Sequence, residues 1–238
     1  MADTSVEGDQ GQRTILSRGT QVIEVGIFLS LIVPSLVLSL FISGQDDEGF
    51  RLTAIMVIVR DLALVSLVLY FVWRSGEGFG RIGWTLKRMP LEVLLGILLF
   101  VPMFFGMSWL EQYFTSIGLS SPPPSASGFL EPRGQAQLGL AVALVVVVAV
   151  AEETIFRGYL LLRFVGIGMG KVLAVLLASV IFAIGHGYEG SAGIATVGVM
   201  GVIFALVYLW RGSLVAPIVM HFLQDFLAIV LLPILVGR

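Results

Sequence analysis

The chain has 238 residues, of which 57% are hydrophobic and 13% are charged, and its formal net charge is −2. Soluble domains carry about 25% charged residues, so this composition, with a mean hydropathy of +0.99, excludes a water-soluble globule. Charges of both signs are scattered along the chain, which excludes the basic face that binds nucleic acid. The sequence contains no cysteine, which removes disulfides, thiol nucleophiles and cysteine-ligated metals.

Two regions differ sharply in polarity. Residues 1–20 are polar and rich in Gly, Ser and Thr, so we expect a disordered N-terminal tail. A membrane-spanning helix needs about 20 mainly apolar residues, and residues 21–238 hold enough such runs for about seven spans. Backbone groups in hydrocarbon must be paired internally, and the runs lack the alternation of barrel strands. The sequence therefore predicts an all-α, polytopic transmembrane helical bundle, formed by a single domain.

The predicted spans follow one another through short polar loops. The first, at about 22–42, lacks a signal-peptide cleavage site and is expected to be retained. The others are predicted at about 52–73, 91–114, 136–162, 172–187, 193–210 and 214–236, and the fifth is short. A segment rich in Pro and Ser, residues 120–135, is expected to form an extended external loop.

The basic residues alternate between loops in a way that sets an orientation. The first loop, residues 45–48, is acidic, whereas the N-terminal tail and the second, fourth and sixth loops carry the basic residues Arg13, Arg18, Arg74, Arg81, Lys87, Arg88, Arg163, Lys171 and Arg211. Because cytoplasmic loops carry an excess of Lys and Arg, we expect a cytoplasmic N-terminus. The predicted location is an integral, multi-pass position in a membrane, which is the cell membrane in a bacterium.

Ionisable side chains cluster in the later spans. An ionisable group at the bilayer centre costs at least about 2.5 kcal/mol, so each one requires a partner or a function. The residues concerned lie in predicted spans four, five and seven, and they are Glu152, Glu153, Arg157, His186, His221 and Asp225. Both histidines of the chain fall inside predicted apolar helices. This grouping predicts a functional site within the membrane.

Helix geometry divides the carboxylates of span four. Glu153 and Arg157 are four residues apart on one face, which predicts an ion pair that neutralises both charges. Glu152 points about 100° away from that pair and has no counter-charge nearby in the sequence. A carboxylate in this position is a candidate general base.

Span seven pairs a histidine with a carboxylate. His221 and Asp225 are also four residues apart, so the carboxylate either fixes the imidazole tautomer or supplies a second ligand beside it. Counting about 1.5 Å per residue from the basic loops places Glu152 and His221 in the inner half of the bilayer. The same count places His186 about 10 Å nearer the outer face.

Polar and aromatic residues elsewhere carry less functional information. Arg60 and Asp61 are adjacent, so they face different sides of span two, and Arg60 is expected to extend to the outer interface. The aromatic residues of span three are expected to pack and to anchor the helix in the interface, and they are Phe100, Phe104, Phe105 and Trp109.

Several membrane hydrolase chemistries are excluded by absent motifs. No span contains the GxSG motif of serine-type proteases, the GxGD motif of aspartyl types, or the HExxH motif of zinc types. The residues that remain are a glutamate and two histidines, which can activate water directly or through a metal.

Three motifs in order give a resemblance to a known family. Residues 152–157 match EExxxR, residues 182–186 match FxxxH and residues 221–225 match HxxxN/D. The chain thereby resembles the CPBP family of intramembrane proteases, which groups type II CAAX prenyl endopeptidases with bacteriocin-processing and self-immunity proteins. The resemblance covers about residues 135–236, and the first three spans are similar only in being hydrophobic.

The resemblance implies peptide-bond hydrolysis in a membrane cavity. It implies that Glu152 and His186 activate water, and that His221 and Asp225 stabilise the oxyanion or help to hold a metal. Prenyl endopeptidases of the family carry Asn where this chain has Asp225. Because an ionised Asp is a poor oxyanion donor, Asp225 is expected to be protonated, to orient His221 or to bind metal.

The metal requirement is left open by the sequence. The family is commonly called a metalloprotease family, and Glu152, His186 and His221 are the residues that would hold zinc. Such a centre leaves no separate base unless Asp225 serves, whereas a glutamate-type mechanism uses the same four residues without a cofactor. We therefore favour no cofactor, with zinc as the alternative.

The expected partners are the lipid bilayer and a membrane-associated protein or peptide substrate, whose identity and prenylation the sequence does not specify. One alternative is a proton- or ion-coupled transporter, since membrane Glu, His and Asp also build proton relays. The absence of inverted repeats counts against it. A second alternative is a catalytically inactive membrane scaffold or immunity protein.

Overall fold

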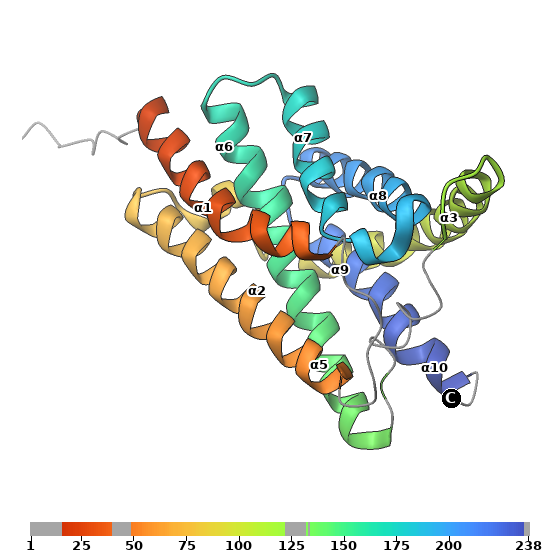
Figure 1. Ribbon diagram of the computed structural model, residues 1–238. Helices are drawn as coiled ribbons and strands as arrows, with labels where there is room; N and C mark the ends of the chain where they lie inside the picture. Colours follow the sequence, from red (N-terminus) through yellow and green to blue (C-terminus); the bar gives the residue numbers. More distant parts are fainter. Residues whose placement is uncertain (1–15, 40–48, 122–131, 133, 236–238) are drawn as a thin grey trace, which may run out of the picture.

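The computed structural model describes residues 16–39, 49–121, 132 and 134–235, and every regular element in these ranges is helical (Figure 1). The longer helices are α1 (Arg18–Ser39), α2 (Gly49–Arg74), α3 (Met89–Ser116), α5 (Gly134–Glu152), α7 (Lys171–Ile184), α8 (Gly190–Arg211) and α9 (Val215–Asp225). The short helices are α6 (Leu161–Gly166) and α10 (Leu232–Leu235), and 3-10 turns lie at Phe79–Ile82 and Gly187–Glu189. The predicted all-α fold is confirmed.

Six helical segments among the described residues are long and apolar enough to cross a membrane. They are Arg18–Val37, Gly49–Arg74, Met89–Ser116, Gly134–Gly166, Gly187–Arg211 and Val215–Leu235. Helix α7 lies where the short fifth span is predicted, and its 14 residues extend for only about 21 Å, less than the roughly 30 Å hydrocarbon core. The chain is an integral, multi-pass membrane protein, and its described residues contain six full spans and one shorter apolar helix.

The N-terminal boundary differs from the prediction. Helix α1 begins at Arg18, inside the predicted tail, because the Ser17 Oγ accepts a hydrogen bond from the Thr20 N–H at 3.1 Å in the manner of a helix N-cap. The rest of the predicted tail, the acidic loop at 45–48 and nearly all of the loop at 120–135 lie outside the described residues. The cytoplasmic N-terminus stays a prediction.

The helices pack in pairs. Helix α2 lies along α5, α3 along α9 and α7 along α8, while α1 crosses the front of the bundle and contacts α2, α6 and α7 (Figure 1). Helices α3 and α9 approach closely, since a Cβ placed at Gly96 would lie 2.8 Å from the Cβ of Val219. Small residues allow such close approach in membranes. The buried core includes Phe28 of α1, Phe164 of α6 and Phe204 of α8.

Two helices change to π geometry directly after a carboxylate. Residues Glu153–Leu160 form a fully buried π-helical segment between α5 and α6, so that Glu152 is the last residue of α5. Residues Phe226–Leu231 form a second π-helical segment, which follows Asp225 at the end of α9. Within the first, the Thr154 hydroxyl donates to the Val150 carbonyl at 2.7 Å, a side-chain bond that competes with the helical ladder. Such segments frequently mark functional sites.

Candidate active site

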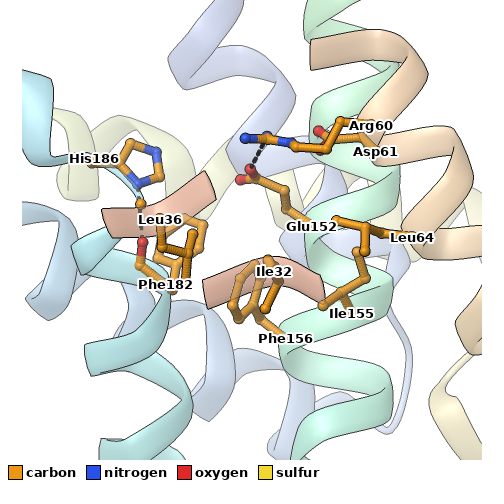
Figure 2. A pocket seen from close by; sticks show the side chains of 11 residues that line it. Ile32, Leu36, Arg60, Asp61, Leu64, Glu152, Ile155, Phe156, Phe182 and His186 are labelled. Carbon is orange, nitrogen blue, oxygen red and sulfur yellow. Dashed lines mark hydrogen bonds and ion pairs between the residues drawn. The ribbon is translucent and has the colours of Figure 1, made fainter. Parts of the chain in front are cut away.

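A pocket lies where α1, α2, α5 and the end of α7 meet. Its polar lining consists of Arg60, Asp61, Glu152 and His186, and its apolar lining includes Ile32 and Leu36 of α1. In Figure 2, Glu152 and Arg60 lie on one side of the pocket and His186 on the other. The cavity has a volume of about 20 Å³, and one water molecule needs roughly 10–15 Å³. The pocket therefore has room for a single water.

His186 lines the same pocket as Glu152, so the predicted depth difference of about 10 Å does not keep the two side chains apart. The prediction assumed a helix that continues to residue 187, but α7 ends at Ile184 and the 3-10 turn Gly187–Glu189 leads directly into α8. Because α7 is too short to cross the membrane, its end places His186 in the interior of the bundle. His186 therefore follows the helix and is not part of it.

The tautomer of His186 follows from its contacts. Its Nδ1 lies 3.1 Å from the Phe182 carbonyl oxygen, and a carbonyl oxygen only accepts, so Nδ1 carries the proton. In the neutral ring, Nε2 is then a hydrogen-bond acceptor. The Phe182 ring, 4.8 Å from the imidazole by centroids, packs against this side chain. His186 is thus able to accept a proton or a hydrogen bond through Nε2.

Glu152 is a nearly buried carboxylate with one oxygen unsatisfied. Its side chain is 13% exposed, and Oε2 is buried without a hydrogen-bond partner among the described residues. Glu152 has no counter-charge nearby in the sequence, but the fold supplies one, because Nη2 of Arg60 lies 3.9 Å from its Oε1. Arg60 therefore does not extend away to the interface as expected. It turns into the pocket, where its Nε donates to Asp61 Oδ1 at 2.8 Å.

His221 is held between three carboxylates. Its Nδ1 donates to Glu153 Oε1 at 2.9 Å, and its Nε2 lies 3.4 Å from Asp225 Oδ2 and 3.8 Å from Glu152 Oε2. Asp225 thus contacts the ring as its spacing predicts, but it does so at Nε2. The carboxylate that fixes the ring at Nδ1 is Glu153, a role that the sequence did not indicate. The contacts at both nitrogens suit the imidazolium form, in which each nitrogen donates.

Glu153 and Arg157 form a buried ion pair. Arg157 Nη1 donates to Glu153 Oε1 at 2.8 Å, and the two side chains are 2% and 0% exposed, respectively. The Arg157 guanidinium also lies 4.2 Å from the centre of the Phe182 ring and 5.2 Å from that of Phe204. Since the same Glu153 oxygen accepts from Arg157 and His221, this ion pair connects the π-helical segment to α9.

Zinc fits poorly among these side chains. In the described part of the chain, no three His, Asp or Glu residues are arranged to hold a metal ion. The Nδ1 atoms of both histidines are already bound, that of His221 to Glu153 and that of His186 to a carbonyl, so only Nε2 of each ring could face a metal. The set Glu152, His186 and His221, which the resemblance suggested as ligands, therefore does not form a metal centre in this geometry.

The structure brings the predicted residues to adjoining positions. Glu152 and His186 line the pocket, and His221 and Asp225 lie on the α9 side of Glu152. Sequence reasoning missed the part played by Arg60 and Asp61. The signal that points to them is the one used for the other motifs, namely two opposite charges within an apolar run of α2.

Comparison with known proteins gives a match to one family model. No curated protein and no solved structure matches the chain. A family model does match residues 134–227, and its description is "Type II CAAX prenyl endopeptidase Rce1-like". The matched segment includes Glu152, His186, His221 and Asp225 in their predicted order. Residues 134–227 are therefore similar to the Rce1-like type II CAAX prenyl endopeptidases.

Proposed function

We propose that the protein is an intramembrane endopeptidase that hydrolyses a peptide bond of a membrane-associated protein or peptide, with Glu152 as the general base. The observation that carries this proposal is the unsatisfied Oε2 of Glu152 beside a cavity with room for one water. Buried polar atoms without a protein partner are usually satisfied by ordered water. A water held there is in contact with a carboxylate that can take its proton.

In the proposed reaction, water adds to the carbonyl group of the scissile peptide bond. The water oxygen bonds to the scissile carbonyl carbon, its proton passes to Glu152, and the carbonyl electron pair moves to oxygen to give a tetrahedral intermediate. When the intermediate collapses, the carbon–nitrogen bond breaks and the proton passes from Glu152 to the leaving amine. His186 supplies a second acceptor for the water through Nε2, because its Nδ1 is bound to the Phe182 carbonyl.

His221 and Asp225 complete the proposed site from α9. Glu153 fixes the His221 ring at Nδ1, so that Nε2–H points toward Glu152 and Asp225. In this position Nε2–H is available to the developing oxyanion when substrate displaces one of its carboxylate contacts. Asp225 orients the ring from the next helical turn. Each residue then has one task.

The reaction is proposed to be of the glutamate type, without a catalytic metal. The support is geometric, because no three potential ligands converge among the described residues. Purified active protein should contain less than stoichiometric zinc and should keep its activity in the presence of a strong chelator. Loss of activity on chelation, restored by zinc alone, would contradict the glutamate mechanism.

The test of the proposed function is cleavage of a panel of membrane peptides by the purified full-length protein. The panel contains C-terminally prenylated peptides, leader peptides and single-span segments, and products are identified by mass spectrometry. Glu152→Gln should abolish cleavage and leave the protein folded, because the amide keeps the size of the side chain and cannot accept the proton. Glu92→Gln is the matched control, because this buried carboxylate pairs with Arg211 outside the pocket, and it should remain active. Activity in Glu152→Gln would refute the assignment.

A further inference from the structure

Arg60 is a cationic side chain of the pocket that the proposed reaction does not use. It lies on α2, outside the segment that matches the family, and Figure 2 shows its guanidinium beside Glu152. A cation within a membrane helix is costly, and such residues face a partner or a polar cavity. We therefore expect Arg60 to have a function next to the proposed base.

The guanidinium is fixed at one end and open at the other. Nε donates to Asp61 Oδ1 at 2.8 Å, and Asp61 is only 2% exposed, so this contact holds the planar group in place. Nη2 lies 3.9 Å from Glu152 Oε1, which is beyond hydrogen-bond distance. Within the described residues, the bond to Asp61 is the one hydrogen bond that Arg60 makes. Its terminal N–H groups are therefore available to a molecule bound in the pocket.

Donors for an oxyanion are scarce on the opposite side of Glu152. Nδ1 of His221 is committed to Glu153, so this ring offers a single donor, Nε2–H, which faces carboxylate oxygens until substrate displaces one of them. An ionised Asp225 only accepts hydrogen bonds, so it contributes no donor in that form. A second cationic donor beside the proposed base is the terminal part of Arg60.

The geometry also suits the charge that develops during hydrolysis. The two oxygens of a tetrahedral intermediate share one carbon, so they lie next to each other. The oxygen that comes from water then contacts Glu152, and the oxygen of the former carbonyl contacts Arg60. The distance of 3.9 Å between Arg60 Nη2 and Glu152 Oε1 allows both contacts. When Glu152 takes the proton, its negative charge is replaced by that of the oxyanion. Arg60 then interacts more strongly with the transition state than with bound substrate, as catalysis requires.

We propose that Arg60 is a further catalytic residue, whose Nη–H groups stabilise the oxyanion of peptide hydrolysis. This inference rests on the proposed function and deepens it. Asp61 is then a positioning residue that acts through Arg60. The bonds made and broken are those of the reaction above, and Arg60 neither gains nor loses a proton.

The test compares Arg60→Gln with wild type in the full-length protein, using a membrane peptide that wild type cleaves. Loss of one preorganised oxyanion donor lowers kcat by about 10²–10³-fold, and KM should change by less than about threefold because the contact belongs to the transition state. Arg60→Lys should keep part of the rate, because the charge remains. Arg51→Gln, an exposed arginine on the same helix, is the matched control and should have wild-type kcat.

A second arm uses Asp225. In Arg60→Gln/Asp225→Asn, the new amide is able to donate to the oxyanion, so kcat should recover by about tenfold or more over Arg60→Gln alone. A purely structural role of Arg60 predicts no such recovery. Arg60→Gln leaves the buried Asp61 carboxylate without its partner, and the protein could then be too unstable to purify. In that case Arg60→Gln/Asp61→Asn removes both charges and should show the same loss of kcat.

Three results would overturn the inference. The first is a kcat within about threefold of wild type in Arg60→Gln or in Arg60→Gln/Asp61→Asn. The second is the absence of recovery in Arg60→Gln/Asp225→Asn. The third is a higher KM restricted to peptides with a free C-terminal carboxylate and absent for amidated peptides, which would make Arg60 a carboxylate anchor. Failure of the proposed function is distinct, since it requires that Glu152→Gln remain active.

Discussion

Glu153→Gln offers the sharpest test of the buried site. The substitution keeps the shape of the side chain and removes the negative charge that Arg157 and His221 share at Oε1. Arg157 is 2% exposed, so its charge cannot reach water. Breaking a buried ion pair by removing one partner costs about 3–5 kcal/mol. At roughly 2–4 °C per kcal/mol for a chain of this size, the melting temperature should fall by on the order of 10 °C.

Thermal unfolding in detergent, followed by intrinsic fluorescence, measures this change. Glu92→Gln is the control, because its partner Arg211 is 20% exposed and keeps access to water, so the loss of stability should be smaller than for Glu153→Gln. Glu153→Gln/Arg157→Met removes both charges and should regain most of the lost stability. Its activity should stay low, because His221 Nδ1 has lost its carboxylate. A fall in melting temperature for Glu153→Gln no larger than that for Glu92→Gln would refute the reasoning.

Two further predictions concern the bundle around the site. Gly96→Ala should destabilise the protein by about 1–3 kcal/mol, because a Cβ there would lie 2.8 Å from Val219 of α9. Gly106→Ala in the same helix is the control, since a Cβ there meets nothing within 4 Å, and it should be neutral or stabilising. Equal melting temperatures of the two variants would contradict this account. Arg163→Gln should lower the melting temperature, because Arg163 lies 3.0 Å from Glu24 and 2.6 Å from Glu77 and its loss leaves two carboxylates in a buried position. Unchanged stability in that variant would show that the three charges do not depend on one another.

Local spacing predicted those parts of the site that lie within one helix. Glu153 and Arg157, and likewise His221 and Asp225, face each other because residues four apart share a helix face. The cost of ionisable groups in hydrocarbon pointed to Glu152 and His186, which line the pocket, but the same argument passed over α1 and α2, which line it as well. These arguments need no knowledge of how the helices are arranged.

Contacts between distant helices were beyond such reasoning. Two contacts depend on how α2, α5 and α9 pack, namely the approach of Arg60 to Glu152 and the bond from His221 to Glu153. The spacing of residues along one helix does not predict how separate helices pack. The π-helical segment that follows Glu152 has no hydrophobic pattern that distinguishes it from an α-helix in the sequence. The end of α7 did have a signal, since His186 stands between Gly185 and Gly187, and glycines on both sides of a residue favour a break in a helix.

Helix α1 forms one wall of the pocket. Ile32 and Leu36 line it from α1, and a space for one water cannot admit a polypeptide, so under the proposed function the walls of the pocket have to separate before cleavage. Pro34 stands between these two residues inside the helix and lacks the N–H of the regular ladder, which weakens the helix there. Under the proposed function, turnover then includes an opening step of the helices around the pocket, and the rate of cleavage should depend on the membrane in which those helices move.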